Sequence, residues 1–308
     1  MLNYYKRTKV DENIITLDKC ETGAWISLIN PNEEEINFVS ELQNVDKDFL
    51  KSATDPDEKP RVEIDNGNVL IIIKIPYKDE NLIYTLSFGI VVSEKNIITI
   101  CTSDNIVIQD FLNLKVKNFY TTKKTRFCLQ ILARANRNYQ KFLDEIEREI
   151  EKTESSITKS FKNEEIIKLL GIQKSLVYIN TAVLSNEKVL ERILGGKLLK
   201  MYSEDEDLLQ DIIDDNKQAI DMVNIYSNIL SSTMDAYASL ISNNLNIVMK
   251  FLTSVTIILA IPSIVTSFYG MNVDLPFQQY HLAYVYVIFI SSFLAVIASY
   301  FFFKKGYF

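Results

Sequence analysis

Oxygen-bearing side chains, rather than nucleophiles, are the groups in this sequence that could do chemistry. The segment SFYGMNVDLPFQ (267–278) follows the first of two long apolar runs and offers one asparagine and one acid. Asn272 would present a side-chain carbonyl beside the free backbone carbonyls of a helix C-terminus. We expect Gly270 to end that helix in a left-handed conformation. Such a neutral collar of oxygens suits Mg²⁺, which prefers octahedral oxygen ligands and keeps several of its waters.

A polar face runs along the apolar segment that precedes this loop. Its members recur at three- and four-residue steps, and two residues extend it toward the N-terminus: Thr253, Thr256, Ala260, Ser263 and Ser267, with Asn246 and Met249. Two helices cannot enclose an aqueous path, so we expect an oligomer in which this face of each subunit lines a central pore. Small residues also favour helix packing in lipid, and periodicity alone leaves that alternative open.

Acidic residues crowd a second region, SEDEDLLQDIIDDNKQAID (203–221). Four of them lie within reach of one another on consecutive helical turns: Asp207, Asp211, Asp214 and Asp215. Such crowding of like charges is destabilising unless a cation bridges the carboxylates. We hypothesise that cytosolic Mg²⁺ bridges them between subunits and closes the pore. The alternative is a solvated acidic helix face.

Several classes of protein are disfavoured. The sequence shows no nucleophile paired with a base and no P-loop spacing, and its net charge of −7 argues against a nucleic-acid binder. Three cysteines without paired spacing indicate reduced thiols. We therefore expect neither an enzyme nor a nucleotide-binding protein. The apolar runs contain no charged residue, which favours passive flow, and the membrane potential supplies a divalent cation with ~4.6 kcal/mol per 100 mV.

The elements that must position these residues change character along the chain. Residues 1–120 predict an α/β domain, with short β-branched runs at 24–31, 68–77, 82–92 and 96–103 and a helix within 30–43. Residues 121–249 predict a helical stalk region, with amphipathic helices over 126–157 and 163–194. Neither glycine nor proline occurs between Gly196 and Pro262, which predicts one helix over 205–269, roughly 100 Å long.

Two membrane spans are expected near the C-terminus. Residues 250–269 and 282–303 each contain a charge-free run of about the ~20 residues that cross a bilayer. They enclose a loop over 270–281, and a basic tail follows at 304–308. Lys250, Lys304 and Lys305 flank the spans, whereas the loop contains Asp274 and neither lysine nor arginine. The positive-inside rule then predicts a multi-pass plasma-membrane protein with both termini in the cytoplasm.

In this setting the tetrapeptide Tyr269-Gly270-Met271-Asn272 resembles the signature of the CorA family of magnesium and cobalt transport proteins, the two-span type with a Gly-Met-Asn motif. The layout is similar over essentially the full chain. The resemblance implies a homopentameric Mg²⁺ channel, permeable in some members to Co²⁺ and Ni²⁺, with the tetrapeptide as its selectivity filter. It also implies inhibition by intracellular divalent cations, with Asp211 the closest positional match.

Two other functions stay open at this point. One is a zinc transporter of the same architecture, with or without proton coupling. The other is a non-conducting, membrane-anchored scaffold whose stalk oligomerises. A polar pore face and the Gly-Met-Asn mouth count against the scaffold, and measurable ion flux would exclude it.

Overall fold

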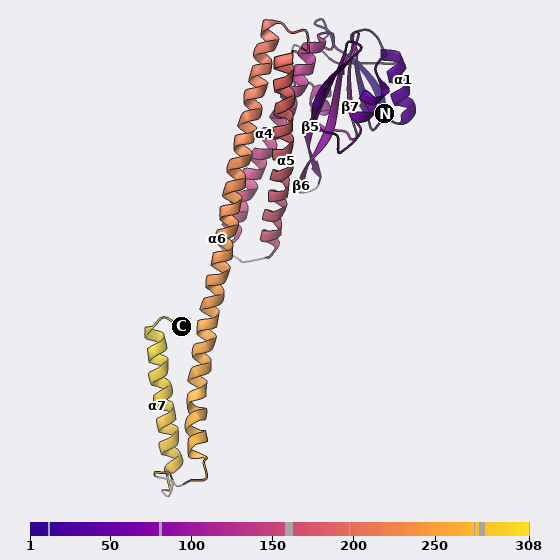
Figure 1. Cartoon of the computed structure of the whole chain (residues 1–308). Coiled ribbons are helices and arrows are strands. Elements are labelled where there is room, and N and C mark those ends of the chain that lie inside the picture. The colour runs from indigo at the N-terminus through magenta and orange to yellow at the C-terminus, as the bar shows by residue number, and fades with distance from the viewer. Residues whose placement is uncertain are drawn as a thin grey trace. The chain divides into compact units, whose positions relative to one another are not determined.

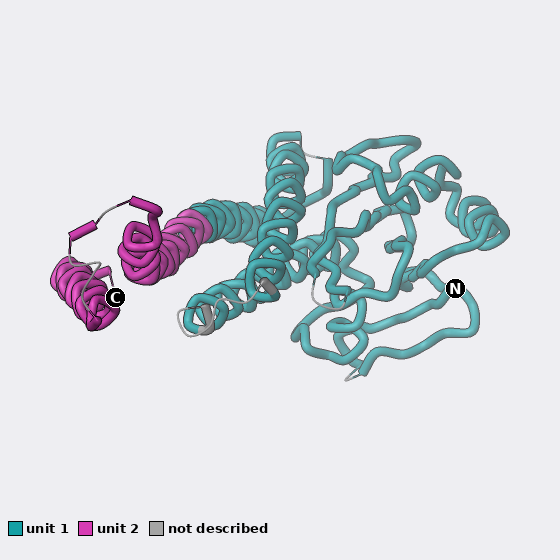
Figure 2. Tube along the Cα trace, turned by 90° about the horizontal axis from the view of Figure 1, so that it is seen from below, with its two compact units in different colours: residues 1–232 teal, residues 233–308 magenta. Residues whose placement is uncertain are grey.

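Figure 1 shows the computed structural model of the chain, which describes residues 1–11, 13–79, 82–157, 163–196, 198–273, 275–276 and 281–307. The described residues form two compact units, 1–232 and 233–308 (Figure 2). The first unit contains a sheet covered by helices, and the second contains two apolar helices. One helix, α6 (Ser203–Tyr269), contributes residues to both units.

A seven-stranded sheet organises the first unit, in the order β2-β1-β3-β7-β6-β5-β4. The strands are β1 (Leu2–Lys6), β2 (Ile15–Leu17), β3 (Trp25–Ile29), β4 (Arg61–Asp65), β5 (Asn68–Asp79), β6 (Leu82–Val92) and β7 (Ile97–Cys101). The pair β3–β7 is parallel, and the other pairs are antiparallel. The four strands predicted from β-branched runs are confirmed. Strands β1, β2 and β4 were not predicted; they lie toward the edges of the sheet and have few fully buried residues.

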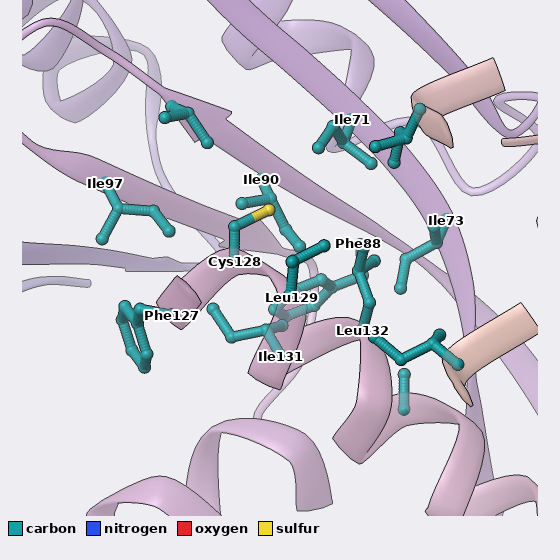
Figure 3. Close-up of a cluster of buried hydrophobic side chains, with 14 of the residues drawn as sticks. Ile71, Ile73, Phe88, Ile90, Ile97, Phe127, Cys128, Leu129, Ile131 and Leu132 are labelled. Carbon is teal, nitrogen blue, oxygen red and sulfur yellow. The ribbon is translucent and has the colours of Figure 1, made fainter. Parts of the chain in front are cut away.

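Alternate residues of the central strands enter two separate cores, one on each face of the sheet. On β5, Leu70 and Ile72 pack beneath α1 (Glu33–Gln43) and α2 (Lys47–Ser52). Ile71 and Ile73 of the same strand enter the other core, which Figure 3 shows between the sheet and α4. That second face is covered by α3 (Ile106–Leu112), α4 (Lys124–Ile157), α5 (Asn163–Gly196) and the first turns of α6. The α/β class predicted from sequence is therefore confirmed.

Two local features explain how the helices seat on the sheet. The side chain of Asn32 accepts the N–H of Glu35, and the Glu35 carboxylate accepts the N–H of Asn32, so a capping box begins α1. On β6, a Cβ at position 89 would lie 2.3 Å from the Cβ of Ala53, just beyond α2. Only glycine allows so close an approach at that strand position.

Helix α5 is a third helix, among the described residues, that is long and apolar enough to cross a membrane. Its apolar side chains have another use, because Leu176, Ile179, Val183 and Leu190 are all buried within the first unit. The hydroxyl of Ser175 accepts the backbone N–H of Ile83 on β6 at 3.0 Å and donates to the carbonyl of Gly171 at 3.2 Å. The composition of α5 is therefore that of a helix packed on a sheet.

Buried side-chain amides tie α6 to its neighbours in the first unit. The Nδ2 of Asn136 on α4 donates to the carbonyl of Ile212 at 2.8 Å, and the Nδ2 of Asn216 donates to the carbonyl of Val183 on α5 at 3.0 Å. At the start of α6, Arg126 donates to Asp205 at 3.1 Å and to the carbonyl of residue 204 at 2.6 Å. These contacts set the register of the helix that carries the acidic segment.

The second unit consists of the C-terminal part of α6 and α7 (Ala283–Lys304). The prediction of one uninterrupted helix from the acidic segment to Tyr269 is confirmed, since α6 has 67 residues and continues through Pro262. The second predicted span corresponds to α7 within one residue at each end. Of the connecting loop, residues 274 and 277–280 lie outside the described residues.

Candidate functional site

The candidate pore residues lie on one side of α6, away from α7. All seven predicted members, from Asn246 to Ser267, are exposed. The partly or fully covered residues between 254 and 269 form a different set: Ser254, Val255, Ile258, Ile261, Pro262, Val265 and Tyr269. With 3.6 residues per turn, the two sets centre on roughly opposite sides of the helix. The polar face is therefore free in the second unit, while the apolar face supports α7.

Four of the predicted residues lie together in one shallow hollow of the surface. Ala260, Ser263, Ser267 and Met271 line it, together with Ile264 and Phe268, and its volume is about 480 Å³. The structure thus places the C-terminal part of the polar face beside Met271, near the start of the loop.

The hydroxyl of Thr256 shows how this face could meet a cation. Its Oγ1 donates to the carbonyl of Leu252 at 2.8 Å, so its only proton is used within the helix. The remaining lone pairs of Oγ1 are acceptors and point away from that bond. An acceptor oxygen of this kind can receive a hydrogen bond from a water in the shell of a hydrated cation.

The end of α6 differs from the prediction at Gly270. Positive φ angles occur at Gly23, Gly67 and Gly306 but not at Gly270, so the expected left-handed helix end is wrong. The physical reason is that the helical ladder continues: the N–H of Gly270 donates to the carbonyl of Thr266 at 2.9 Å. The next N–H, of Met271, donates to the carbonyl of Phe268 at 3.3 Å in a tighter turn.

Among the described residues, no neighbouring atom requires glycine at position 270. A Cβ there would lie 3.4 Å from the carbonyl oxygen of Thr266 and 3.5 Å from that of Ser267, which are ordinary contacts. Met271 and Asn272 are exposed, while Tyr269 lies on the partly covered side with Pro262. The tetrapeptide therefore combines one partly covered residue, Tyr269, with three exposed ones.

The acidic segment is exposed at each of its four candidate positions, Asp207, Asp211, Asp214 and Asp215. Asp214 accepts a hydrogen bond from Gln210 at 3.1 Å. Among the described residues of the chain, no group of three His, Cys, Asp or Glu side chains is arranged to hold a metal ion. A cation held by three or more side chains at this segment would need carboxylates from a second chain. Asp205 is different, because it is buried and paired with Arg126.

At the end of the spans opposite the loop, the basic residues lie beside a turn that was not predicted. Gly306 has φ +68°, its N–H donates to the carbonyl of Phe303, and the N–H of Tyr307 donates to that of Phe302. This is a Schellman motif, completed by the packing of the Phe302 and Tyr307 rings with centroids 5.6 Å apart. A glycine two residues beyond the last helical residue, Lys304, is the sequence signal that could have found it.

The turn brings the two ends of the membrane helices together. The Nζ of Lys250 on α6 lies 5.9 Å from the centroid of the Tyr307 ring. Lys304 ends α7, and the Nζ of Lys305 lies 5.4 Å from the centroid of Phe301. The three lysines therefore share one end of the helix pair, and the loop with Asn272 lies at the other.

Fold and site together define a membrane protein with an α/β domain, a long helix and two C-terminal spans. The model of the family described as CorA-like Mg²⁺ transporter protein matches residues 21–305. The cobalt/magnesium transport protein CorA of Methanocaldococcus jannaschii is 34% identical over 257 residues, which cover 80% of this chain and 79% of that protein. The protein of the same name from Thermotoga maritima is 23% identical over 308 residues, 98% of this chain and 88% of its own length.

The comparison of structures agrees with these matches. The complete structure of the CorA magnesium transporter from Methanocaldococcus jannaschii superimposes with a TM-score of 0.87 at 29% identity, covering 100% of this chain and 99% of that one. The chain therefore belongs to the CorA-like Mg²⁺ transporter family.

Proposed function

We propose that this chain is the subunit of a homo-oligomeric channel, a pentamer by family resemblance, that passes Mg²⁺ down its electrochemical gradient and also carries Co²⁺ and Ni²⁺. The relatives are named cobalt/magnesium transport proteins, which supports divalent-cation transport by this chain. The observation that carries the channel mechanism is the exposed polar face of α6, which lies opposite the side that packs on α7. A lone pair of helices offers no reason for such a face in lipid, whereas a ring of subunits would turn it toward water.

The filter of this channel is assigned to Gly270, Met271 and Asn272, with Tyr269 as its base. The part of the chain that the structure describes supplies no steric reason for glycine at 270. A close approach of subunits or of a hydrated ion at the mouth would supply one. Asn272 would then contribute a carbonyl oxygen from each subunit, which binds the water shell of Mg²⁺ weakly enough for release.

Control of the channel is assigned to the acidic segment of α6. Its four exposed aspartates do not form a metal site within one chain. Cytosolic Mg²⁺ held between subunits would neutralise their repulsion and keep the stalk helices together, and its loss would let them separate. The amides of Asn136 and Asn216 hold α6 in register with α4 and α5. Because the pore face lies on the same helix, a shift of α6 would also move the pore face.

The orientation follows from the cluster of Lys250, Lys304 and Lys305 at one end of the spans. The contact between Lys250 and Tyr307 joins the base of the first span to the end of the second. Under the positive-inside rule this end is cytoplasmic and the loop is external. The α/β unit is then in the cytosol.

The test is ion flux into liposomes that contain the purified protein and an internal Mg²⁺ dye, under an imposed potential. We expect Mg²⁺ influx with the wild type, loss of influx with Asn272→Ala, and wild-type influx with Asn228→Ala, an exposed asparagine of α6 in the first unit. Equal influx with both variants would place the filter elsewhere. A preparation that passes Zn²⁺ but not Mg²⁺ would favour the zinc transporter, and no flux of either ion would favour the scaffold.

A further inference from the structure

An apolar groove lies between the two membrane helices of the second unit. Its lining contains no charged side chain and comes from both helices: Ile257, Ile261, Ile264 and Val265 of α6, and Leu294, Ile297, Ala298, Phe301 and Phe302 of α7. Its volume is about 420 Å³, within the ~300–1,000 Å³ typical of ligand pockets. Such a groove suits a hydrocarbon chain.

The groove ends beside positive charge. The rings of Phe301 and Phe302 line the end of the groove, and each is connected to a lysine through ring contacts. The Nζ of Lys305 lies 5.4 Å from the centroid of the Phe301 ring. The ring of Tyr307 packs at a tilt against Phe302, and the Nζ of Lys250 lies 5.9 Å from the Tyr307 centroid. None of the ion pairs among the described residues involves Lys250, Lys304 or Lys305.

We propose that this groove is a binding site for one anionic phospholipid, with an acyl chain against the apolar lining and the phosphate held by Lys250 and Lys305. The acyl chain contributes through burial of apolar surface, and the phosphate through lysines at the end of the spans. The site depends only on the helices being in a bilayer. Its place in the cytoplasmic leaflet depends in addition on the orientation proposed above.

Charge complementarity favours a lipid phosphate at this end of the groove. The membrane segments 251–269 and 282–303 contain no charged residue, and the charges that flank them at this end are lysines. A phosphate neutralises these lysines, and an acyl chain fills the groove below them.

The experiment is native mass spectrometry of the full-length protein in detergent, with equal amounts of phosphatidylglycerol and phosphatidylcholine of identical chains. Wild-type protein is expected to retain more of the anionic lipid. Lys250→Gln and Lys305→Gln should each lower the ratio of anionic to neutral lipid about fivefold, the effect of removing one lysine from an anionic surface. Lys217→Gln, an equal change of charge on the exposed side of α6 in the first unit, should leave the ratio unchanged.

A second pair of variants tests the groove itself. Ala298→Phe places a ring in the lining and should remove the tightly held phosphatidylglycerol. Val296→Phe adds a comparable ring on the same helix at an exposed position outside the lining and should have no effect. Equal retention of both lipids by the wild type would overturn the proposal, as would lysine variants with wild-type ratios. Lipid loss with Ala298→Phe only through dissociation of the oligomer would assign the groove to a subunit contact instead. No arm measures flux, so the channel and the lipid site can fail separately.

Discussion

Replacing Asp110 with asparagine should destabilise the α/β unit by about 3–5 kcal/mol, because the change leaves a buried guanidinium without its counter-charge. The Asp110 side chain is fully buried, and that of Arg134 is 9% exposed. The Nε of Arg134 donates to Oδ2 at 2.7 Å, and its Nη2 lies 2.6 Å from the same oxygen. An asparagine keeps the shape and one acceptor but not the charge.

Lys115 provides the matched control. Its Nζ contacts the other carboxylate oxygen of Asp110 at 3.0 Å, but its side chain is 58% exposed. An exposed partner of this kind contributes only about 0–1 kcal/mol. Lys115→Gln should therefore stay close to the wild type, and the difference between the two variants measures the buried pair alone.

The effect should depend on pH in a defined direction. Burial raises the pKa of Asp110, but hydrogen bonds from Lys115 and Arg134 and their positive charges outweigh it and lower the pKa below its usual 3.8. A carboxyl whose pKa is lower in the folded chain adds stability above the pKa of the unfolded chain and loses it as the pH falls through the folded pKa. The difference in the free energy of unfolding between wild type and Asp110→Asn should be largest at neutral pH and should narrow below about pH 4.

The single tryptophan supplies the assay. Trp25 is buried, and its ring centroid lies 6.2 Å from that of Phe111, the neighbour of Asp110. Its fluorescence during heating therefore reports on the first unit of the full-length protein. At about 2–4 °C per kcal/mol, the midpoint should fall by about 6–20 °C. Two results would refute this prediction: an Asp110→Asn midpoint equal to that of the wild type at neutral pH, or a difference between the midpoints that is unchanged at about pH 3.

Three further predictions test the seating of α6 in the first unit, the contact between β6 and Ala53, and the polar face of α6. Asn216→Ala removes the buried hydrogen bond to the Val183 carbonyl and should lower the free energy of unfolding of the first unit by about 1–3 kcal/mol. The midpoint of the same fluorescence transition should fall, and an unchanged midpoint would contradict this. Gly89→Ala forces its Cβ against Ala53 and should cost about 1–3 kcal/mol, partly restored by adding Ala53→Gly; lack of rescue would count against that contact as the cause. Thr256→Val should lower Mg²⁺ flux roughly two- to tenfold, while Thr266→Val, whose hydroxyl bonds to the Pro262 carbonyl outside the predicted face, should not; equal flux would remove Thr256 from the pathway.

The elements that follow from local periodicity were predictable. The helix over α6, both membrane segments and the polar face depend on residues three or four apart, and such residues are neighbours wherever the chain is helical. The β-branched runs of β3, β5, β6 and β7 are buried on both faces, so their composition alone indicates strands. Strands β1, β2 and β4 lack that composition and exist because a neighbouring strand offers hydrogen bonds.

What depended on tertiary structure was the choice among locally equivalent options. Both Gly270 and Gly306 follow the end of a helix, yet only Gly306 adopts the left-handed conformation, where Tyr307 can pack on Phe302. Helix α5 and helix α7 are both apolar, but α5 buries one apolar face within the first unit. The sequence by itself determined which residues share a face. Only packing decided what each face meets, because contacts between distant segments have no periodicity to reveal them.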